Sequence, residues 1–295
     1  MNRVEEPKVN WGGSWTERKL NAFEKYVRAY LMIMQAQKEK YNGWPTTIYL
    51  DGFAGSGSRY NEEEKNLFSE YFDENEINVY KGSAERVLKL EQKFDFYYFI
   101  DTDKTAIKNL EAKLKEYNLV NNQCHFINDD VNNQLMNLLN ILDKKSAALV
   151  LLDPFGMQVN WSSIESLAGK RIDLWTLLPS GIIINRLLDN KGKLIFSSKL
   201  ESFFGLRIDE IKNQFYKIEN NQTFFKIEKK IKKVDDSINK IAQLYIFKLK
   251  KIFKYVTESP LVLYNDKNVA IYHFIFASNN KTAYKIAKYI IEETI

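Results

Sequence analysis

The chain has 295 residues, of which 45% are hydrophobic and 27% are charged, and its formal net charge is +5. This length and apolar content indicate one large globular domain, or one domain with an insertion. The single cysteine, Cys124, excludes an intrachain disulfide, and the two histidines, His125 and His273, lack metal-ligand spacing, which argues against a structural zinc site. The first residues form no apolar signal region and no run reaches the length of a membrane span, so we expect a cytoplasmic protein.

An N-terminal helical segment, 1–45, is predicted first. Thr16 is its expected N-cap residue, although Lys19 at the third helical position leaves the capping box incomplete. Apolar residues then recur at helical spacing, at Leu20, Phe23, Tyr26, Val27, Tyr30, Leu31 and Met34. We expect this helix to cover a sheet or the entrance of a ligand site, and core packing is the commoner role for such a helix.

The segment 46–51 is a predicted β-strand that ends at Asp51 and continues directly into the turn Gly52-Phe53-Ala54-Gly55-Ser56-Gly57. The strand would bring Asp51 to the carboxyl edge of a sheet, and the glycines allow positive φ and a close approach of the backbone to a ligand. The spacing differs from the dinucleotide fingerprint, and the acidic residues 62–64 disfavour a pyrophosphate. An acidic surrounding suits a cationic ligand such as S-adenosylmethionine.

This run resembles the first cofactor motif of S-adenosylmethionine-dependent methyltransferases, especially those acting on nucleobases. The resemblance implies that the turn binds the cofactor, through Asp51, Gly52, Phe53, Ala54, Gly55 and Gly57. The alternative is an ordinary tight turn after a strand.

A second predicted strand, 94–101, ends in Asp101. An acidic residue at this place holds the ribose hydroxyls of a nucleoside cofactor, so Asp101 is the candidate for that role and Asp103 is its competitor. Either acid suits the N-cap of the following helix equally well, and the two acids can divide the two roles.

A third predicted strand, 123–128, is followed by Asp129 and Asp130. A polar group at this place could reach the adenine edge of the cofactor, and Asp130 fits that role better than Asp129. A helix N-cap is an equally good interpretation of Asp130.

The fourth predicted strand, 147–153, is an unbroken apolar run, typical of a strand buried on both faces of a parallel sheet. It ends in Asp153, Pro154 and Phe155. The oxygens of Asp153 and Pro154 could accept both hydrogens of an amine, and Phe155 could stack on the planar group that carries it. The run resembles the fourth motif of amino-methyltransferases acting on DNA and RNA. The sequence D-P-F-G is also similar to the motif of some tRNA guanine methyltransferases. The alternative is a strand-ending turn with Phe155 in the core.

A fifth predicted strand, 171–178, leads through Pro179, Ser180 and Gly181 to the substrate candidates Asn185 and Arg186. Ligands of open α/β sheets bind at the carboxyl edge, which these residues share with the other motifs. Asn185 could orient a substrate amide or base edge, and Arg186 could meet a phosphate or a carboxylate. The alternative is a helix with one buried polar pair.

The basic character of the chain is local. Between Lys226 and Lys254 ten lysines and three acids give a net charge of +7, so the rest of the chain sums to −2. We predict a basic, mostly helical insertion, 190–256, in which a helix pair with interleaved aromatic residues tracks a nucleic acid backbone through 226–254. Those aromatic residues are Tyr245, Phe247, Phe253 and Tyr255. The alternative is the solvated face of an amphipathic helix.

The predicted elements alternate between strands and helices, which favours a parallel sheet with helices on both faces. The helices are expected at 83–93, 104–117, 131–142, 161–169 and 280–293, and a closing antiparallel hairpin at 260–265 and 268–277. The predicted fold class is therefore α/β, a Rossmann-like class I methyltransferase sheet with a helical insertion, whose main domain spans 46–189 and 257–295.

Several stretches together resemble the three-Cys-motif partner family of bacterial proteins. They include Trp15-Thr16-Glu17, Asp51-Gly52-Phe53-Ala54-Gly55, Gly82-Ser83-Ala84, Phe99-Ile100-Asp101, Leu151-Leu152-Asp153-Pro154-Phe155-Gly156-Met157-Gln158-Val159, Asn185-Arg186-Leu187-Leu188, Phe203-Phe204-Gly205 and Tyr272-His273-Phe274-Ile275-Phe276-Ala277-Ser278-Asn279. The resemblance implies a methyltransferase-like fold and a partner with a three-cysteine motif, similar to radical S-adenosylmethionine proteins. One departure is Asp129, which stands where relatives tend to have glycine and adds bulk and charge near the adenine pocket.

From these motifs we expect an S-adenosylmethionine-dependent methyltransferase that modifies an amine nitrogen on a planar substrate such as a nucleobase. The alternative function is a non-catalytic partner subunit that keeps this fold in order to dock a three-Cys-motif protein.

Overall fold

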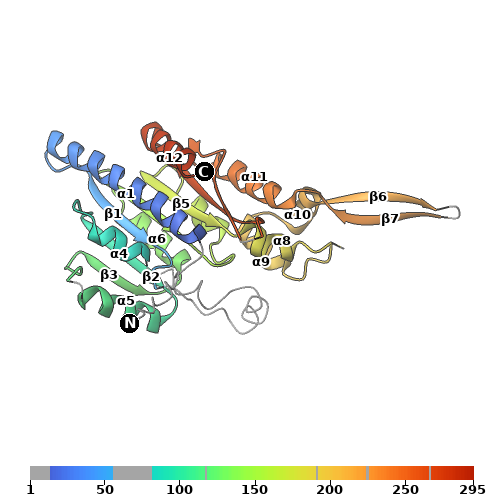
Figure 1. The fold of residues 1–295 in the computed structure, drawn as a ribbon, viewed down its shortest axis with the longest axis horizontal. Coiled ribbons are helices and arrows are strands. Elements are labelled where there is room, and N and C mark those ends of the chain that lie inside the picture. Colours follow the sequence, from blue (N-terminus) through green and yellow to red (C-terminus); the bar gives the residue numbers. More distant parts are fainter. Residues whose placement is uncertain (1–13, 56–81, 117, 191, 224–225, 266) are drawn as a thin grey trace, which may run out of the picture.

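The computed structural model describes residues 14–55, 82–116, 118–190, 192–223, 226–265 and 267–295 (Figure 1). Gly57, one of the predicted cofactor residues, lies outside these ranges. Within them, no helix has both the length and the apolar character that a bilayer crossing requires.

One large sheet forms the centre of the molecule, with the strand order β3-β2-β1-β4-β5-β10-β8, and β9 also pairs with β10. The first five strands of this order are mutually parallel, and β10 is antiparallel to β5, β8 and β9. The strands are β1 Thr46–Asp51, β2 Phe96–Asp101, β3 Cys124–Asn128, β4 Ser146–Leu152, β5 Ile172–Leu178, β8 Tyr255–Val256, β9 Leu261–Tyr264 and β10 Ala270–Ser278. This arrangement confirms the predicted fold, a Rossmann-like methyltransferase sheet that is mostly parallel and closes with an antiparallel hairpin.

Burial explains why the strand predictions succeed. All residues of β4 and β5 are buried, as expected for parallel strands covered on both faces. Every strand predicted from the sequence is present, and its ends agree within two residues.

Helices cover both faces of the sheet (Figure 1). α1 packs against α4 and α12 in one layer, and α7 packs against α6 and α9 in another. The helices are α1 Ser14–Lys40, α4 Gly82–Lys89, α5 Lys104–Glu116, α6 Val131–Ile141, α7 Trp161–Glu165, α8 Asn185–Leu187, α9 Ser197–Phe204, α10 Ile208–Phe215, α11 Ser237–Leu249 and α12 Lys281–Thr294, with a π-helical turn, η1, at Ser180–Ile184.

The apolar stripe of α1 packs on the sheet through aromatic pairs. The ring centroids of Phe23 and Trp175 are 6.3 Å apart, and those of Tyr26 and Phe276 are 4.9 Å apart. The predicted N-cap at Thr16 is wrong, because the helix begins at Ser14 and Thr16 is buried inside its first turn. Trp15 stacks on Tyr272 of β10 with centroids 5.3 Å apart, so tertiary packing extends the helix past the expected cap.

The insertion contains a feature that the sequence did not predict. β6 (Tyr216–Thr223) and β7 (Lys226–Lys233) pair as an antiparallel two-stranded ribbon that projects from the body (Figure 1). The predicted basic helix pair is therefore wrong over Lys226–Lys233, which is a strand, and correct for α11. Of the aromatic residues assigned to its surface, Tyr245 and Phe253 are buried in the core and Phe247 is 58% exposed.

Candidate acidic site at the carboxyl edge of the sheet

Three buried acids lie at the carboxyl ends of the adjacent strands β2, β1 and β4. Asp101 ends β2, Asp51 ends β1 and Asp153 follows β4, and their exposed fractions are 2%, 1% and 4%. The parallel register places these strand ends side by side, at the edge where open α/β sheets bind ligands. The structure thus brings together three residues that the sequence singled out separately.

Asp51 uses its carboxylate to hold the turn that follows it. Its Oδ1 accepts a hydrogen bond from the backbone N–H of Phe53 at 3.2 Å, and its Oδ2 accepts from Ser83 Oγ at 2.8 Å and from the Tyr49 hydroxyl at 3.2 Å. Burial raises the pKa of Asp51 to about 6, and the nearby charge of Asp153 adds to the rise. These bonds make Asp51 an organiser of the glycine turn.

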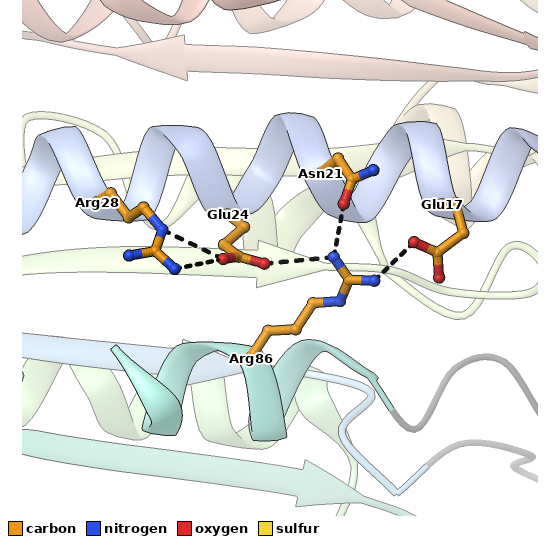
Figure 2. Close-up of polar contacts among 5 residues, drawn as sticks. All are labelled: Glu17, Asn21, Glu24, Arg28 and Arg86. Atoms are coloured by element: carbon orange, nitrogen blue, oxygen red, sulfur yellow. Dashed lines mark hydrogen bonds and ion pairs between the residues drawn. The ribbon is translucent and has the colours of Figure 1, made fainter. Parts of the chain in front are cut away.

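Ser83 reaches Asp51 because α4 is held against α1 (Figure 2). Arg86 of α4 contacts three residues of α1, with 2.7 Å to Glu17, 2.7 Å to Asn21 and 3.3 Å to Glu24. A single partly exposed ion pair contributes at most about 1 kcal/mol, but a guanidinium shared by three acceptors also fixes the position of the helix.

The two described glycines of the turn are required for space. Gly52 and Gly55 both have negative φ, so the expected use of positive φ is wrong here. A Cβ on Gly55 would lie 3.1 Å from Asp101 Cβ and 3.1 Å from the backbone of Ala106, and one on Gly52 would lie 2.6 Å from Val131 Cγ2. The glycines therefore let the turn pack directly against the end of β2 and against α6.

Of the two acids, Asp103 takes the N-cap role, and binding of a ribose by Asp101 stays a prediction. Asp103 caps α5, since its Oδ1 accepts from Thr105 N at 2.8 Å and from Ala106 N at 3.1 Å. Asp101 Oδ1 accepts from the backbone N–H of Asp103 at 2.7 Å, whereas its Oδ2 is buried and no donor meets it with hydrogen-bond geometry in the part of the chain that the structure describes. Burial raises the pKa of Asp101 to about 6, and the backbone N–H groups of Asp103 and Gly55 oppose that rise. A buried carboxylate oxygen of this kind can accept hydrogen bonds from a bound ligand.

Asp130 caps α6, in agreement with the alternative interpretation of that residue. Its Oδ1 accepts from Asn132 N at 2.7 Å, and the carboxylate is exposed. The neighbouring Asp129 accepts from Gln134 Nε2 at 2.7 Å and from Asn133 Nδ2 at 3.0 Å, and these bonds lower the pKa of Asp129. A contact between Asp130 and an adenine edge stays a prediction.

Asp153 forms an ion pair that was not predicted from the sequence. Lys19 Nζ of α1 lies 2.5 Å from Asp153 Oδ2, and both side chains are buried. Desolvation lowers the pKa of Lys19, while the charges of Asp153 and Asp51 oppose that shift. A signal existed, because Lys19 lies four residues before Phe23 and therefore on the buried stripe of α1.

Phe155 is 5% exposed, which matches its alternative role as a core residue. Pro154 and Gly156 are also buried, and Gly156 N donates to Gln158 Oε1 at 2.7 Å. Stacking of Phe155 on a substrate stays a prediction that requires its ring to become accessible.

Asn185 and Arg186 follow η1 at the end of β5. Asn185 Oδ1 accepts from Ser237 Oγ of α11 at 2.6 Å, and the Asn185 carbonyl accepts from Lys233 Nζ of β7. Arg186 is exposed. The predicted alternative, a buried polar pair, is wrong because the two residues differ in burial. Asn185 links the sheet edge to the insertion, and substrate contacts by either residue remain predictions.

A different cavity, of about 380 Å³, lies at the opposite edge of the sheet. It is lined by residues at the amino ends of β4 and β5 and the carboxyl end of β10, among them Asp173 and Ser278. Asp173 accepts from the Tyr26 hydroxyl at 2.7 Å and from Ser278 Oγ at 2.5 Å. Burial raises the pKa of Asp173 to about 6. None of the residues predicted to be functional lines this cavity.

Comparison with protein-family models and with curated proteins gives no match to the chain. Several solved structures resemble it remotely. Protein LPL1258 from Legionella pneumophila is 14% identical with a TM-score of 0.41, over 92% of this chain and 89% of that one. An rRNA methylase from Streptococcus thermophilus is 11% identical with a TM-score of 0.29, over 65% and 90%. A plantazolicin methyltransferase, BpumL, solved in complex with SAH, is 12% identical with a TM-score of 0.32, over 90% and 86%. The fold assignment rests on the strand order and register given above.

Proposed function

We propose that this chain is an S-adenosylmethionine-dependent methyltransferase whose cofactor lies across the acidic edge formed by β1, β2 and β4. The observation that supports this most directly is Asp101 Oδ2, a buried acceptor without a donor among the described residues, packed beside Gly55 of the turn after β1. A carboxylate at this place in the fold accepts hydrogen bonds from the two ribose hydroxyls of a nucleoside.

The charge of this edge favours a cationic cofactor. Asp51, Asp101 and Asp153 outnumber Lys19, the buried cation found beside them. A pyrophosphate would add negative charge to an edge that is already acidic, whereas a sulfonium and an amino group are attracted to it. The cofactor would supply an activated methyl group, so the tasks of the chain are to bind, to orient and to exclude water.

We further propose that Asp153, Pro154 and Phe155 receive an amine on a planar substrate such as a nucleobase. Lys19 holds Asp153 Oδ2 in place through the buried ion pair, and a carboxylate oxygen accepts a hydrogen bond from an amine. If the acceptor is a base in a duplex, it must leave the stack to reach this edge. The variant Asp153→Asn is expected to lose methyl transfer and to keep its affinity for the cofactor, and loss of cofactor binding would contradict this role.

Thermal unfolding with and without S-adenosylmethionine or S-adenosylhomocysteine tests the cofactor. A ligand that binds only the folded state stabilises it by about 2.7 kcal/mol at a hundred times its dissociation constant. The increase should appear in the native protein, be clearly smaller in Asp101→Asn and persist in Asp173→Asn, the matched acid at the opposite sheet edge. No increase in the native protein would contradict the proposal.

One alternative function is a docking subunit that keeps this fold for a partner, as the three-Cys-motif resemblance implies. The ion pair is consistent with it, because Lys19 already holds an oxygen of Asp153 that a substrate amine would otherwise meet. The two functions separate in the same experiment, because a docking subunit without a cofactor shows no stabilisation by either ligand.

A further inference from the structure

The β6–β7 ribbon of the insertion is strongly basic, and its described residues Lys217, Ile218, Ile231 and Lys232 are exposed. Between Tyr216 and Lys233 the sequence holds six lysines and two glutamates, a net charge of +4 within a chain of +5. The ribbon projects away from the body of the molecule (Figure 1). A two-stranded ribbon that packs on nothing else is only marginally stable. Because such a ribbon adds little to the stability of the fold, we expect it to contact another molecule.

The two faces of the ribbon differ near its base. Ile218 and Ile231 lie directly opposite each other across the strands and are 68% and 47% exposed. The next pair along, Lys217 and Lys232, is also exposed and points to the other face, because neighbouring residues of a strand alternate. Like charges directly opposite lower the stability of a ribbon. Near its base the ribbon thus presents an apolar pair on one face and a cationic pair on the other.

The base of the ribbon is attached to the candidate site. Lys233 Nζ donates to the carbonyl of Asn185, which follows β5 at the carboxyl edge of the sheet. Val234 N donates to Phe215 O at 2.9 Å, closing the ribbon onto α10. The base of the ribbon is therefore joined to the same carboxyl edge of the sheet that carries Asp51, Asp101 and Asp153.

We propose that the β6–β7 ribbon is an arm that binds duplex DNA in its major groove and presents it to the acidic edge. The inference deepens the proposed function by naming its substrate class. The major groove of B-form DNA is about 12 Å wide and admits a two-stranded ribbon, whereas the major groove of an RNA duplex is too narrow for side chains to read. The face with the exposed isoleucines turns to the bases and contacts thymine methyl groups, and the long side chains of Lys217 and Lys232 extend past the strand edges to the phosphates that border the groove.

Fluorescence anisotropy with the full chain tests the arm. The probes are a labelled DNA duplex of about 20 base pairs, two helical turns, and an RNA duplex of the same sequence. The native protein should prefer DNA, and the double variant Lys217→Gln with Lys232→Gln should bind about tenfold more weakly, with its salt slope reduced by about two. The matched control, Lys144→Gln with Lys145→Gln, changes two exposed lysines at the amino end of β4 and should leave binding unchanged.

A second comparison tests insertion into the groove. Ile218→Ser with Ile231→Ser should weaken binding to the thymidine-containing duplex, and the native protein should lose affinity when deoxyuridine, which lacks the methyl group, replaces thymidine. The proposed DNA-binding role would be contradicted if the lysine variant and its control bound DNA equally well, or if RNA bound as tightly as DNA or more tightly. The lysines would then serve to prevent the exposed strands of the ribbon from pairing with strands of other chains.

Stabilisation by S-adenosylhomocysteine, measured on the same preparations, separates the two proposals. The lysine variant should keep that stabilisation. DNA binding without stabilisation by S-adenosylhomocysteine would support the DNA-binding ribbon and contradict the proposed methyltransferase. Stabilisation without DNA binding would support the methyltransferase and contradict the DNA-binding ribbon.

Discussion

Asp101 and Asp173 are buried acids at opposite edges of the same sheet, and burial raises the pKa of each to about 6. They differ in their surroundings. Both oxygens of Asp173 accept hydrogen bonds from the buried hydroxyls of Tyr26 and Ser278, so the protein itself supplies a donor to each oxygen of this acid. One oxygen of Asp101 lacks a donor among the described residues. Burial and a raised pKa are thus shared by a structural acid and a candidate ligand-binding acid, and the unsatisfied oxygen distinguishes them.

The largest effect on stability is expected from the ion pair beside Asp101. Lys19→Met leaves the carboxylate of Asp153 buried without its cation, which should reduce the free energy of unfolding by about 3–5 kcal/mol. The double variant Lys19→Met with Asp153→Leu replaces the pair by apolar groups and should recover most of that loss. Urea unfolding measures both variants. An equally unstable double variant would show that Lys19 stabilises the fold independently of Asp153.

A smaller loss is expected at the opposite edge. Asp173→Ala removes the acceptor of two buried hydroxyls and should cost about 2 kcal/mol of unfolding free energy, measured in the same way. Its stabilisation by S-adenosylhomocysteine should match that of the native protein. A loss of ligand binding here would break the distinction between the two acids.

The smallest effect concerns pH. Both acids keep a proton to higher pH in the folded than in the unfolded state, so each contributes stability below about pH 4 that is lost as the pH rises to about 6. Of these two acids, Asp101 should also control affinity, because its ionised form accepts the ribose hydroxyls. Calorimetric titration of S-adenosylhomocysteine should show about tenfold tighter binding at pH 7 than at pH 5. Asp101→Asn should weaken this dependence, to which Asp51 with its pKa of about 6 also contributes, and Asp173→Asn should keep it.

The sequence predicts the sheet well because each strand can be recognised from its own residues, without knowledge of its partners. β4 is a nearly continuous apolar run and β5 a mostly apolar one, each of the length of a strand, and β1 and β2 each end in an acid. The pairing of Lys19 with Asp153 joins residues 134 positions apart, and helical periodicity alone gives no partner for a lysine on an apolar stripe.

The ribbon escaped prediction for the opposite reason. At the base of β7 the neighbouring residues Ile231 and Lys232 are both exposed, so neither face is marked by burial, and the lysine-rich run Lys226–Lys233 has the composition of a solvated helix. Only its pairing with Tyr216–Thr223 makes it a strand.

The place of β10 in the sheet has a consequence for how the chain is made. β5 pairs with β10 along one side, and the bond from Ser278 to Asp173 joins residues 105 positions apart. During synthesis β5 therefore leaves the ribosome long before the strand that covers it, and its backbone stays open to pairing with other chains. A nascent or truncated chain that stops before Ala270 has an open sheet edge made of buried-type residues, so aggregation during synthesis competes with completion of the fold.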